Sequence, residues 1–361
     1  MLRFLTALVL LASPAMAERL QTSAGPVDVK PVVSGLDTPW AVAFLPDRGY
    51  LITERDGALL RITPDGRRET LSGVPEVRAR GQGGLLDVVL DPGIAENATI
   101  YLSYSEPVGI RSARTAVARA RLDGTYLRDL EVIYRQQPEQ TGGRHFGSRI
   151  VPDGEGGLYV TLGDRGEADL AQSIGRDMGK VVRINADGTP RDNGAFPGHG
   201  HLWSIGHRNP QGAALDETGQ LWTVAHGARG GDEINRPEAG KNYGWPVISY
   251  GQTYAGFQIG EGTRKDGMEQ PLWYWDPSIA PSGMAIYSGK LWPEWAGDIF
   301  VGSLKFDMIS RLDRDGARIV GEEQLFQGRF GRIRDVREGP EGALWFLAEA
   351  DGTLYRVTPA E

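Results

Sequence analysis

A short pattern recurs along the chain: an apolar segment, a turn rich in Asp, Pro and Gly, and a second apolar segment that opens with an aromatic residue. The first copy runs from Ala41 to Thr53, with its turn at Pro46–Asp47 and its second segment opening at Tyr50. The other five second segments open at Tyr101, Tyr159, Trp222, Phe300 and Trp345. The copies are separated by roughly 45 to 80 residues, a spacing that fits four-stranded blades with loop insertions better than solenoid repeats.

This pattern predicts an all-β fold, a six-bladed β-propeller with four-stranded antiparallel blades. The 50 glycines and 22 prolines favour many tight turns between short strands over long helices. We expect the stretch from Val27 to Val33 to complete the last blade. A β-sandwich with additional hairpins is the alternative architecture.

The first residues have the three parts of a secretory signal. Met1–Arg3 carries a positive charge, Phe4–Leu11 is apolar, and Ala15–Ala17 is a run of small or unbranched residues typical of a cleavage site. The apolar run is well short of the ~20 residues that span a bilayer, so cleavage is favoured over a membrane anchor. We therefore predict a signal peptide at residues 1–17, a single catalytic domain at residues 18–361, no transmembrane segment, and a periplasmic or secreted location.

The net charge argues against one class of binding partner, and the absence of cysteine excludes disulfide bonds as a source of stability. The net charge of −8 argues against nucleic acid, because surfaces that bind phosphate backbones normally have a basic balance. The chain has no cysteine, so an exported protein of this kind depends on its core or on bound metal and not on disulfides. With 361 residues, a large core is available.

Several polar residues lie in glycine-rich turns far apart in the chain. They are Gln82, His145, Arg208, Asn209, Lys305, Arg332 and Arg334. Arg332 and Arg334 are two residues apart and would face the same side of a strand. Loops of different blades meet around the channel of a propeller, so these residues can share one ligand. Four cations with two side-chain amides match a ligand that carries several carboxylates.

His145 is the candidate general base of this set, because the pKa of an imidazole is near neutral. Taken alone, a structural histidine is the competing interpretation. The segment from His226 to Asn235, followed by Lys241–Pro246, is rich in carboxylates and glycine. Such loops can turn main-chain carbonyls toward calcium, although a plain acidic surface loop is the alternative. The chain contains no P-loop, dinucleotide fingerprint or H-E-x-x-H motif.

Together these motifs resemble the soluble pyrroloquinoline quinone (PQQ)-dependent aldose sugar dehydrogenases, a family that includes soluble glucose dehydrogenase. The resemblance covers nearly all of the chain after residue 17. The ordered motifs that carry it are Gly81–Asp87, Gly143–His145, Gly206–Gly212, His226–Asn235, Asn242–Pro246, Gly302–Lys305 and Arg332–Asp335.

The resemblance implies PQQ at one end of the channel of a six-bladed propeller. His145 would be the general base, and Arg208 would bind the cofactor and orient the reacting hydroxyl. The other implied PQQ ligands are Gln82, Asn209, Tyr254, Lys305, Arg332 and Arg334. Carbonyls of Gly227 and Ala228 would hold a calcium ion at the quinone, and Glu233 with the Tyr243 region would hold a second, structural calcium. The better-known glucose enzyme has proline where Ala228 stands, a change that preserves the carbonyl ligand.

The implied reaction is oxidation of the anomeric hydroxyl of an aldose sugar to a lactone, with hydride transfer to PQQ. The electrons would then pass to an acceptor that the sequence does not identify. Two other functions compete with this one. A calcium-dependent lactonase-type propeller hydrolase would not need the cations, and a non-catalytic binding propeller would leave His145, Gln82 and the two arginines without a shared role.

Overall fold

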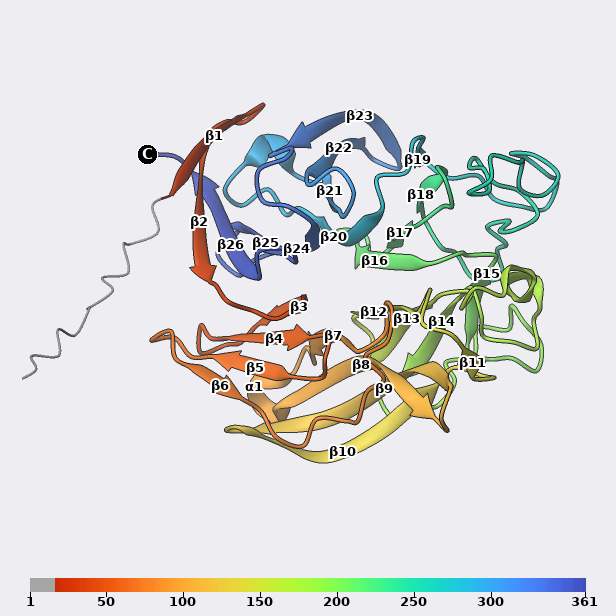
Figure 1. Ribbon diagram of the computed structural model, residues 1–361, viewed down its shortest axis with the longest axis horizontal. Helices are drawn as coiled ribbons and strands as arrows, with labels where there is room; N and C mark the ends of the chain where they lie inside the picture. Colours follow the sequence, from red (N-terminus) through yellow and green to blue (C-terminus); the bar gives the residue numbers. More distant parts are fainter. Residues whose placement is uncertain (1–16) are drawn as a thin grey trace, which may run out of the picture.

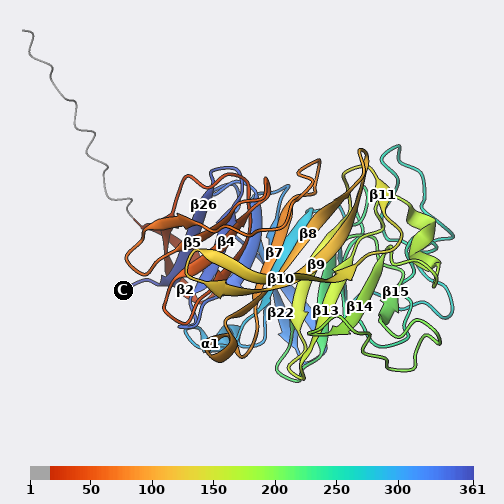
Figure 2. The ribbon, with the colours of Figure 1, turned by 90° about the horizontal axis from the view of Figure 1, so that it is seen from below.

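The computed structural model describes residues 17–361, so the predicted signal peptide lies outside the described residues except for Ala17. Six antiparallel sheets stand around a central axis (Figure 1). The view from the side shows strands running between two faces that loops cover (Figure 2). The predicted six-bladed β-propeller is therefore confirmed. No helix within residues 17–361 is long and apolar enough to cross a membrane.

The first three blades follow in chain order from the innermost strand outward. The first blade consists of β3 (Pro39–Phe44), β4 (Tyr50–Glu54), β5 (Leu59–Ile62) and β6 (Arg68–Thr70). The second consists of β7 (Leu85–Leu90), β8 (Thr99–Val108), β9 (Ser112–Asp123) and β10 (Tyr126–Arg135), with β11 (Gln140–Thr141) paired to β9. The third consists of β12 (Gly147–Pro152), β13 (Gly157–Leu162), β14 (Lys180–Asn185) and β15 (Leu202–Ile205).

The next two blades have the same order, and the sixth borrows strands from the N-terminal end. The fourth consists of β16 (Pro210–Leu215), β17 (Leu221–Ala225), β18 (Asp232–Asn235) and β19 (Trp273–Trp275). The fifth consists of β20 (Pro281–Ile286), β21 (Ile299–Ser303), β22 (Ile309–Asp315) and β23 (Arg318–Leu325). The sixth consists of β24 (Ile333–Glu338), β25 (Leu344–Ala348), β26 (Thr353–Pro359), β2 (Gly25–Val33) and β1 (Glu18–Thr22).

The sixth blade closes the ring by pairing the two ends of the chain. Strand β2 pairs antiparallel with β26, and Val29 lies opposite Val357 (Figure 1). This confirms the predicted role of the stretch from Val27 to Val33. Within the described residues, helical structure is limited to α1 (Ile94–Asn97) and two short 3₁₀ segments at Ala168–Gln172 and Pro293–Trp295.

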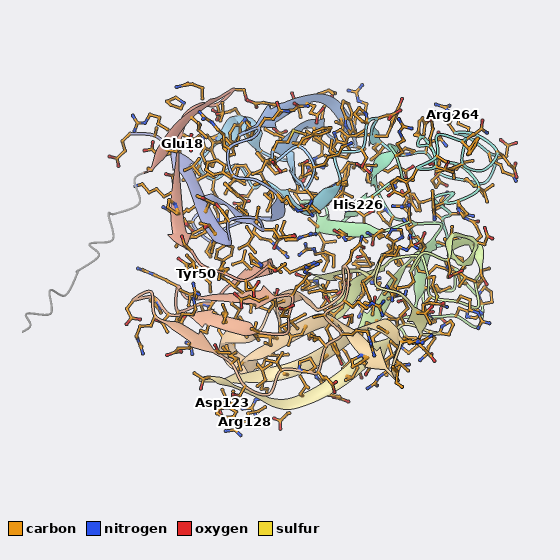
Figure 3. All side chains as sticks on the ribbon, in the orientation of Figure 1. Glu18, Tyr50, Asp123, Arg128, His226 and Arg264 are labelled. Carbon is orange, nitrogen blue, oxygen red and sulfur yellow. The ribbon has the colours of Figure 1, made fainter. Side chains whose placement is uncertain are left out.

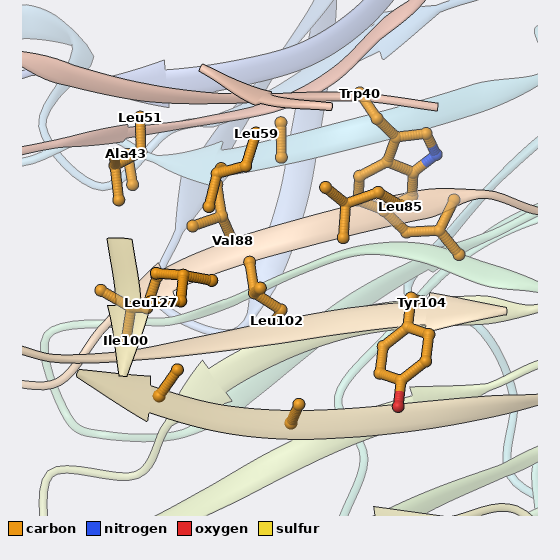
Figure 4. Packing of buried hydrophobic residues seen from close by; sticks show 14 of the residues in the cluster. Trp40, Ala43, Leu51, Leu59, Leu85, Val88, Ile100, Leu102, Tyr104 and Leu127 are labelled. Atoms are coloured by element: carbon orange, nitrogen blue, oxygen red, sulfur yellow. The ribbon is translucent and has the colours of Figure 1, made fainter. Parts of the chain in front are cut away.

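The aromatic residues of the repeated pattern all fall on the second strand of a blade. The central positions of these strands are buried, and β13, β17, β21 and β25 are buried at every position. They are buried on both sides because each blade packs face to face with its neighbours. Figure 4 shows one such core between the first two blades, where Trp40, Leu51 and Leu59 meet Leu85 and Val88.

A buried ion-pair network joins the innermost strands near the axis. Arg149 on β12 lies 2.8 Å from Asp87 on β7 and 3.2 Å from Asp335 on β24. Arg337 contacts the same two carboxylates at 2.9 Å each. The Arg149 guanidinium also lies 4.5 Å from the ring centroid of Trp40. Three blades are thus tied together at the centre of the ring.

Candidate cofactor site and catalytic histidine

Four of the predicted site residues occupy equivalent places in different blades, just before an innermost strand begins. Gln82 precedes β7, His145 precedes β12, Asn209 precedes β16 and Arg332 precedes β24. Innermost strands of a propeller all start at the same face and surround the axis. Residues separated by more than sixty positions in the sequence are therefore brought to one opening.

A cavity of about 390 Å³ lies at this opening. Of the predicted residues, it brings together Gln82, Arg332 and Arg334. The rest of its lining consists of Trp40, Arg55, Gly81, Gln211, His226, Ala280, Leu304 and Glu349. His226, one of these residues, is labelled near the middle of the ring in Figure 3.

Positive charge dominates this cavity. Among the described residues that line it, three are arginines and one, Glu349, is a carboxylate. Glu349 accepts a 2.6 Å hydrogen bond from Arg334 Nε, and Arg334 Nη1 donates to the Gln211 amide oxygen at 3.1 Å. Burial lowers the pKa of Arg334, and the charge of Glu349 opposes this. Glu349 Oε1 also lies 3.7 Å from Arg332 Nε, so a single carboxylate stands against three guanidiniums. This excess of positive charge suits a ligand with several negative charges.

Glu349 itself stays ionised. Its burial would raise its pKa, but the charge and hydrogen bond of Arg334 outweigh that effect, and the pKa lies below its ordinary value. The carboxylate therefore orients Arg334 and leaves the cavity with an excess of cations.

His145 is held by hydrogen bonds on two sides. Its Nδ1 lies 2.6 Å from Asp164 Oδ1, and the other oxygen of Asp164 accepts a 2.9 Å hydrogen bond from Trp245 Nε1. The His145 backbone N–H donates to Gln82 Oε1 at 2.7 Å. With Nδ1 donating to a carboxylate, the neutral ring carries its lone pair on Nε2. This is the arrangement of an oriented base.

The environment of His145 favours the neutral ring. Burial lowers its pKa, the hydrogen bond to Asp164 opposes this, and the positive charge of Arg208 lowers the pKa further. The net shift is downward from 6.5. A base at this position is therefore unprotonated at neutral pH.

Arg208 and Asn209 lie beside the histidine. Arg208 is buried, donates to the carbonyl of Gly227, and stacks over the Trp245 ring at 5.3 Å. Asn209 Oδ1 accepts a 3.0 Å hydrogen bond from the Gly147 N–H at the start of β12. Asn209 thereby fixes the strand that follows His145.

Two of the predicted metal ligands, Gly227 and Glu233, lie next to Arg208, whereas Ala228 and Tyr243 do not line the void that these two share. Gly227, whose N–H donates to Asp232 at 2.7 Å, and Glu233 line a small void beneath Arg208, and the Gly227 carbonyl is the acceptor used by Arg208. Burial raises the pKa of Glu233 to about 7. The Tyr243 ring stacks on His207 at 4.8 Å. Within residues 17–361, no three His, Cys, Asp or Glu side chains cluster as metal ligands. A calcium site here would combine main-chain carbonyls, which suit that ion, with few side-chain carboxylates such as Glu233.

Four predicted cofactor residues do not line the cavity: Arg208 and Asn209, which lie beside His145, and Tyr254 and Lys305, which are exposed. Tyr254 is 74% exposed, in the long connection between β18 and β19. Lys305 is exposed, with its ammonium 4.9 Å from the Phe306 ring centroid, and only its neighbour Leu304 lines the cavity.

Sequence reasoning missed three residues of the site. Arg55 lies in the turn after β4, Glu349 follows β25, and Asp164 follows β13. Asp164 and Glu349 each follow a buried second strand, a position that could have indicated them. Arg55 also follows a second strand, β4, but its Glu-Arg-Asp-Gly sequence is that of an ordinary turn.

Comparisons with known proteins agree with this geometry. The model of the family described as Glucose / Sorbosone dehydrogenase matches residues 36–356. Aldose sugar dehydrogenase YliI of Escherichia coli (strain K12) is 42% identical, over 99% of this chain and 98% of its own.

Two solved structures have the same fold. The apo-form of the soluble aldose sugar dehydrogenase from Escherichia coli superposes with a TM-score of 0.89 at 42% identity, covering 92% of this chain and 100% of that one. The PQQ-bound form of aldose sugar dehydrogenase from Streptomyces coelicolor gives a TM-score of 0.78 at 27% identity, covering 92% and 98%. The chain belongs to the Glucose / Sorbosone dehydrogenase family.

Proposed function

We propose that this protein oxidises the anomeric hydroxyl of aldose sugars to lactones with PQQ as hydride acceptor. The observation that carries the proposal is the cavity with three arginines and one carboxylate, connected through Gln82 to a buried His145–Asp164 pair. PQQ bears three carboxylates, and the excess of cations in the cavity matches them. When bound, PQQ supplies an ortho-quinone that accepts a hydride.

The side chains have distinct roles in this proposal. Arg332, Arg334 and Gln82 bind the carboxylates and polar edge of the cofactor. Lys305, Asn209 and Tyr254 complete its contacts, and for Lys305 and Tyr254 this requires their exposed side chains to turn toward the cavity.

The reaction itself uses His145 and Arg208. His145 Nε2 accepts the proton of the C1 hydroxyl while the hydride leaves C1, and the sugar becomes a lactone. Asp164 stabilises the imidazolium that forms, because its carboxylate already accepts the Nδ1 hydrogen. Arg208 orients the reacting hydroxyl.

Calcium is the second cofactor of the proposal. The carbonyls of Gly227 and Ala228 would hold one ion, and Glu233 with the Tyr243 region a structural one. An ion held by these carbonyls would supply Lewis acidity for the reaction. Arg208 would release its hydrogen bond to the Gly227 carbonyl when the ion binds, and would then be free for cofactor and substrate.

Reconstitution tests the function. Apoprotein with PQQ and calcium should reduce a redox dye when an aldose is added, with release of the corresponding lactone. No dye reduction with any member of a panel of aldoses would refute the proposal. Lactone hydrolysis in the absence of PQQ would favour the lactonase alternative.

A matched variant tests the base. We expect His145→Ala to keep PQQ affinity and to lose most turnover, because it removes the proton acceptor and leaves the arginines in place. The measurement is turnover per PQQ-loaded site, with loading determined by titration. An undiminished rate in the reconstituted variant would refute the base assignment.

The partners and location complete the proposal. The electron acceptor is a quinone, cytochrome or dye that reoxidises the cofactor. The protein acts in the periplasm or outside the cell after cleavage of residues 1–17.

A further inference from the structure

Arg165, next to Asp164, is a buried cation with an unusual set of partners. Arg165 is only 3% exposed, and its guanidinium carbon lies 3.5 Å from the Phe146 ring centroid. Within residues 17–361 no carboxylate lies within ion-pair distance of it, and its Nε is buried without a hydrogen-bond partner. Burial lowers its pKa to about 10. Burying a charge without a carboxylate partner is costly, so its retention calls for a specific role.

The hydrogen bonds of Arg165 all go to one segment. Its Nη1 donates to the carbonyl of Arg144, and its Nη2 donates to the carbonyl of Gly142 at 3.3 Å. Its backbone N–H donates to the carbonyl of His145 at 3.3 Å. The guanidinium fork and the main chain of one residue therefore bind three carbonyls of the segment Gly142–Phe146.

That segment carries the base and touches a cofactor residue. Gln82 N–H donates to the Gly143 carbonyl at 2.7 Å, and Gln82 Oε1 accepts from His145 N–H at 2.7 Å. A methyl group at Gly81 would stand 2.3 Å from the Gly143 carbonyl oxygen, so the two loops are in close contact. Fixing the segment Gly142–Phe146 fixes His145 and Gln82 relative to each other.

The backbone is strained both in this segment and at Arg165 itself. His145 has φ of 57° and Arg165 has φ of 59°, both in the left-handed region although neither is glycine. Residues in this region are strained by about 1–3 kcal/mol and persist only where their surroundings hold them.

We propose that Arg165 is a positioning residue, which clamps the segment Gly142–Phe146 so that the base and the Gln82 cofactor contact keep their mutual geometry. The inference rests on the proposed function for its catalytic consequence. A purely structural role, in which Arg165 only packs on Phe146, is the alternative that the test must exclude.

The test compares Arg165→Met and Arg165→Lys with the control Arg176→Met. Arg176 is exposed and lies in the same connection between β13 and β14. Turnover per PQQ-loaded site should fall about 10- to 100-fold in Arg165→Met, because a small displacement of a catalytic group can lower the rate by up to about 100-fold. Lysine keeps the charge but not the two-pronged fork, so Arg165→Lys should restore only part of the rate. The control should match the wild type.

Hydrogen exchange of the apoprotein gives a second measurement that needs no catalysis. The amides of Gln82 and His145 should exchange faster in Arg165→Met than in the wild type, while amides of the fifth blade should be unchanged. If Arg165→Met does not fold, Arg165→Lys carries both measurements.

The outcomes separate the two claims. Faster exchange together with a wild type that oxidises no aldose would overturn the proposed function and leave the clamp standing. Unchanged exchange and wild-type turnover per loaded site in both Arg165 variants would overturn the clamp. A loss of thermal stability with unchanged exchange at Gln82 and His145 and unchanged turnover per loaded site would also overturn it, because that is the pattern of packing alone.

Discussion

The pKa of His145 links burial to the pH range in which the protein can work. Burial lowers it below 6.5, and the hydrogen bond to Asp164 recovers only part of the shift. A histidine with a depressed pKa stays unprotonated to lower pH, so the base form survives into mild acid.

We therefore expect the acid limb of kcat/KM for aldose oxidation to have its midpoint below pH 6.5. A pH–rate profile of the reconstituted protein, with cofactor loading checked at each pH, measures it. A midpoint at or above 6.5 would show that His145 is not the titrating base or that its environment is not the one described. The Arg176→Met variant should give the same profile as the wild type.

Individual site residues could be predicted only where the local sequence is unusual. Gln82, His145 and the Arg208–Asn209 pair stand in glycine-rich motifs, and their positions before innermost strands agree with the expected convergence. Arg55 and Glu349 each follow the second strand of a blade, but only the closed ring shows that they line the same cavity. Lys305 and Tyr254 are exposed outside the lining. This could not be predicted, because the sequence does not give the direction in which a side chain points.

At the scale of elements, the second strands were the most predictable part of the fold. Each must be buried on both faces, so each reads as an apolar run with an aromatic start, such as Tyr159 on β13 or Phe300 on β21. Outer strands are half exposed, carry mixed sequences such as Arg68–Thr70, and give little signal. The long connection from residue 236 to 272 has no such periodicity, and its path could not be predicted.

Strand β2 gives a stability prediction for ring closure. Val29 is 1% exposed and packs in the core of the sixth blade, whereas Val32 on the same strand is 40% exposed. Val29→Ala should lower the free energy of unfolding by about 2 kcal/mol, because it removes two buried methyl groups and leaves a cavity. Val32→Ala should change it by less than about 0.5 kcal/mol. Urea unfolding measures both, and equal effects would contradict the described pairing of β2 in the closed blade.

At the scale of the whole molecule, the ring converts distant turns into one pocket. A chain with net charge −8 places three arginines from the first and sixth blades around a single cavity. The Arg149 and Arg337 network with Asp87 and Asp335 ties β24, the strand that carries Arg334, to the innermost strands β7 and β12 of two other blades. The order of motifs along the sequence predicted the family, while the geometry of convergence required the closed ring.

Equilibrium titration of the apoprotein with PQQ tests this convergence most directly. The variants are Arg55→Met from the first blade and Arg332→Met from the sixth, with Arg19→Met, at the exposed pair with Asp28, as the control. A charge-assisted hydrogen bond contributes about 1.5–3 kcal/mol, so each site variant should weaken PQQ binding by about 10- to 100-fold while the control binds as the wild type does. Equal affinity in all four proteins would mean that guanidiniums from different blades do not hold one ligand, and would contradict the account.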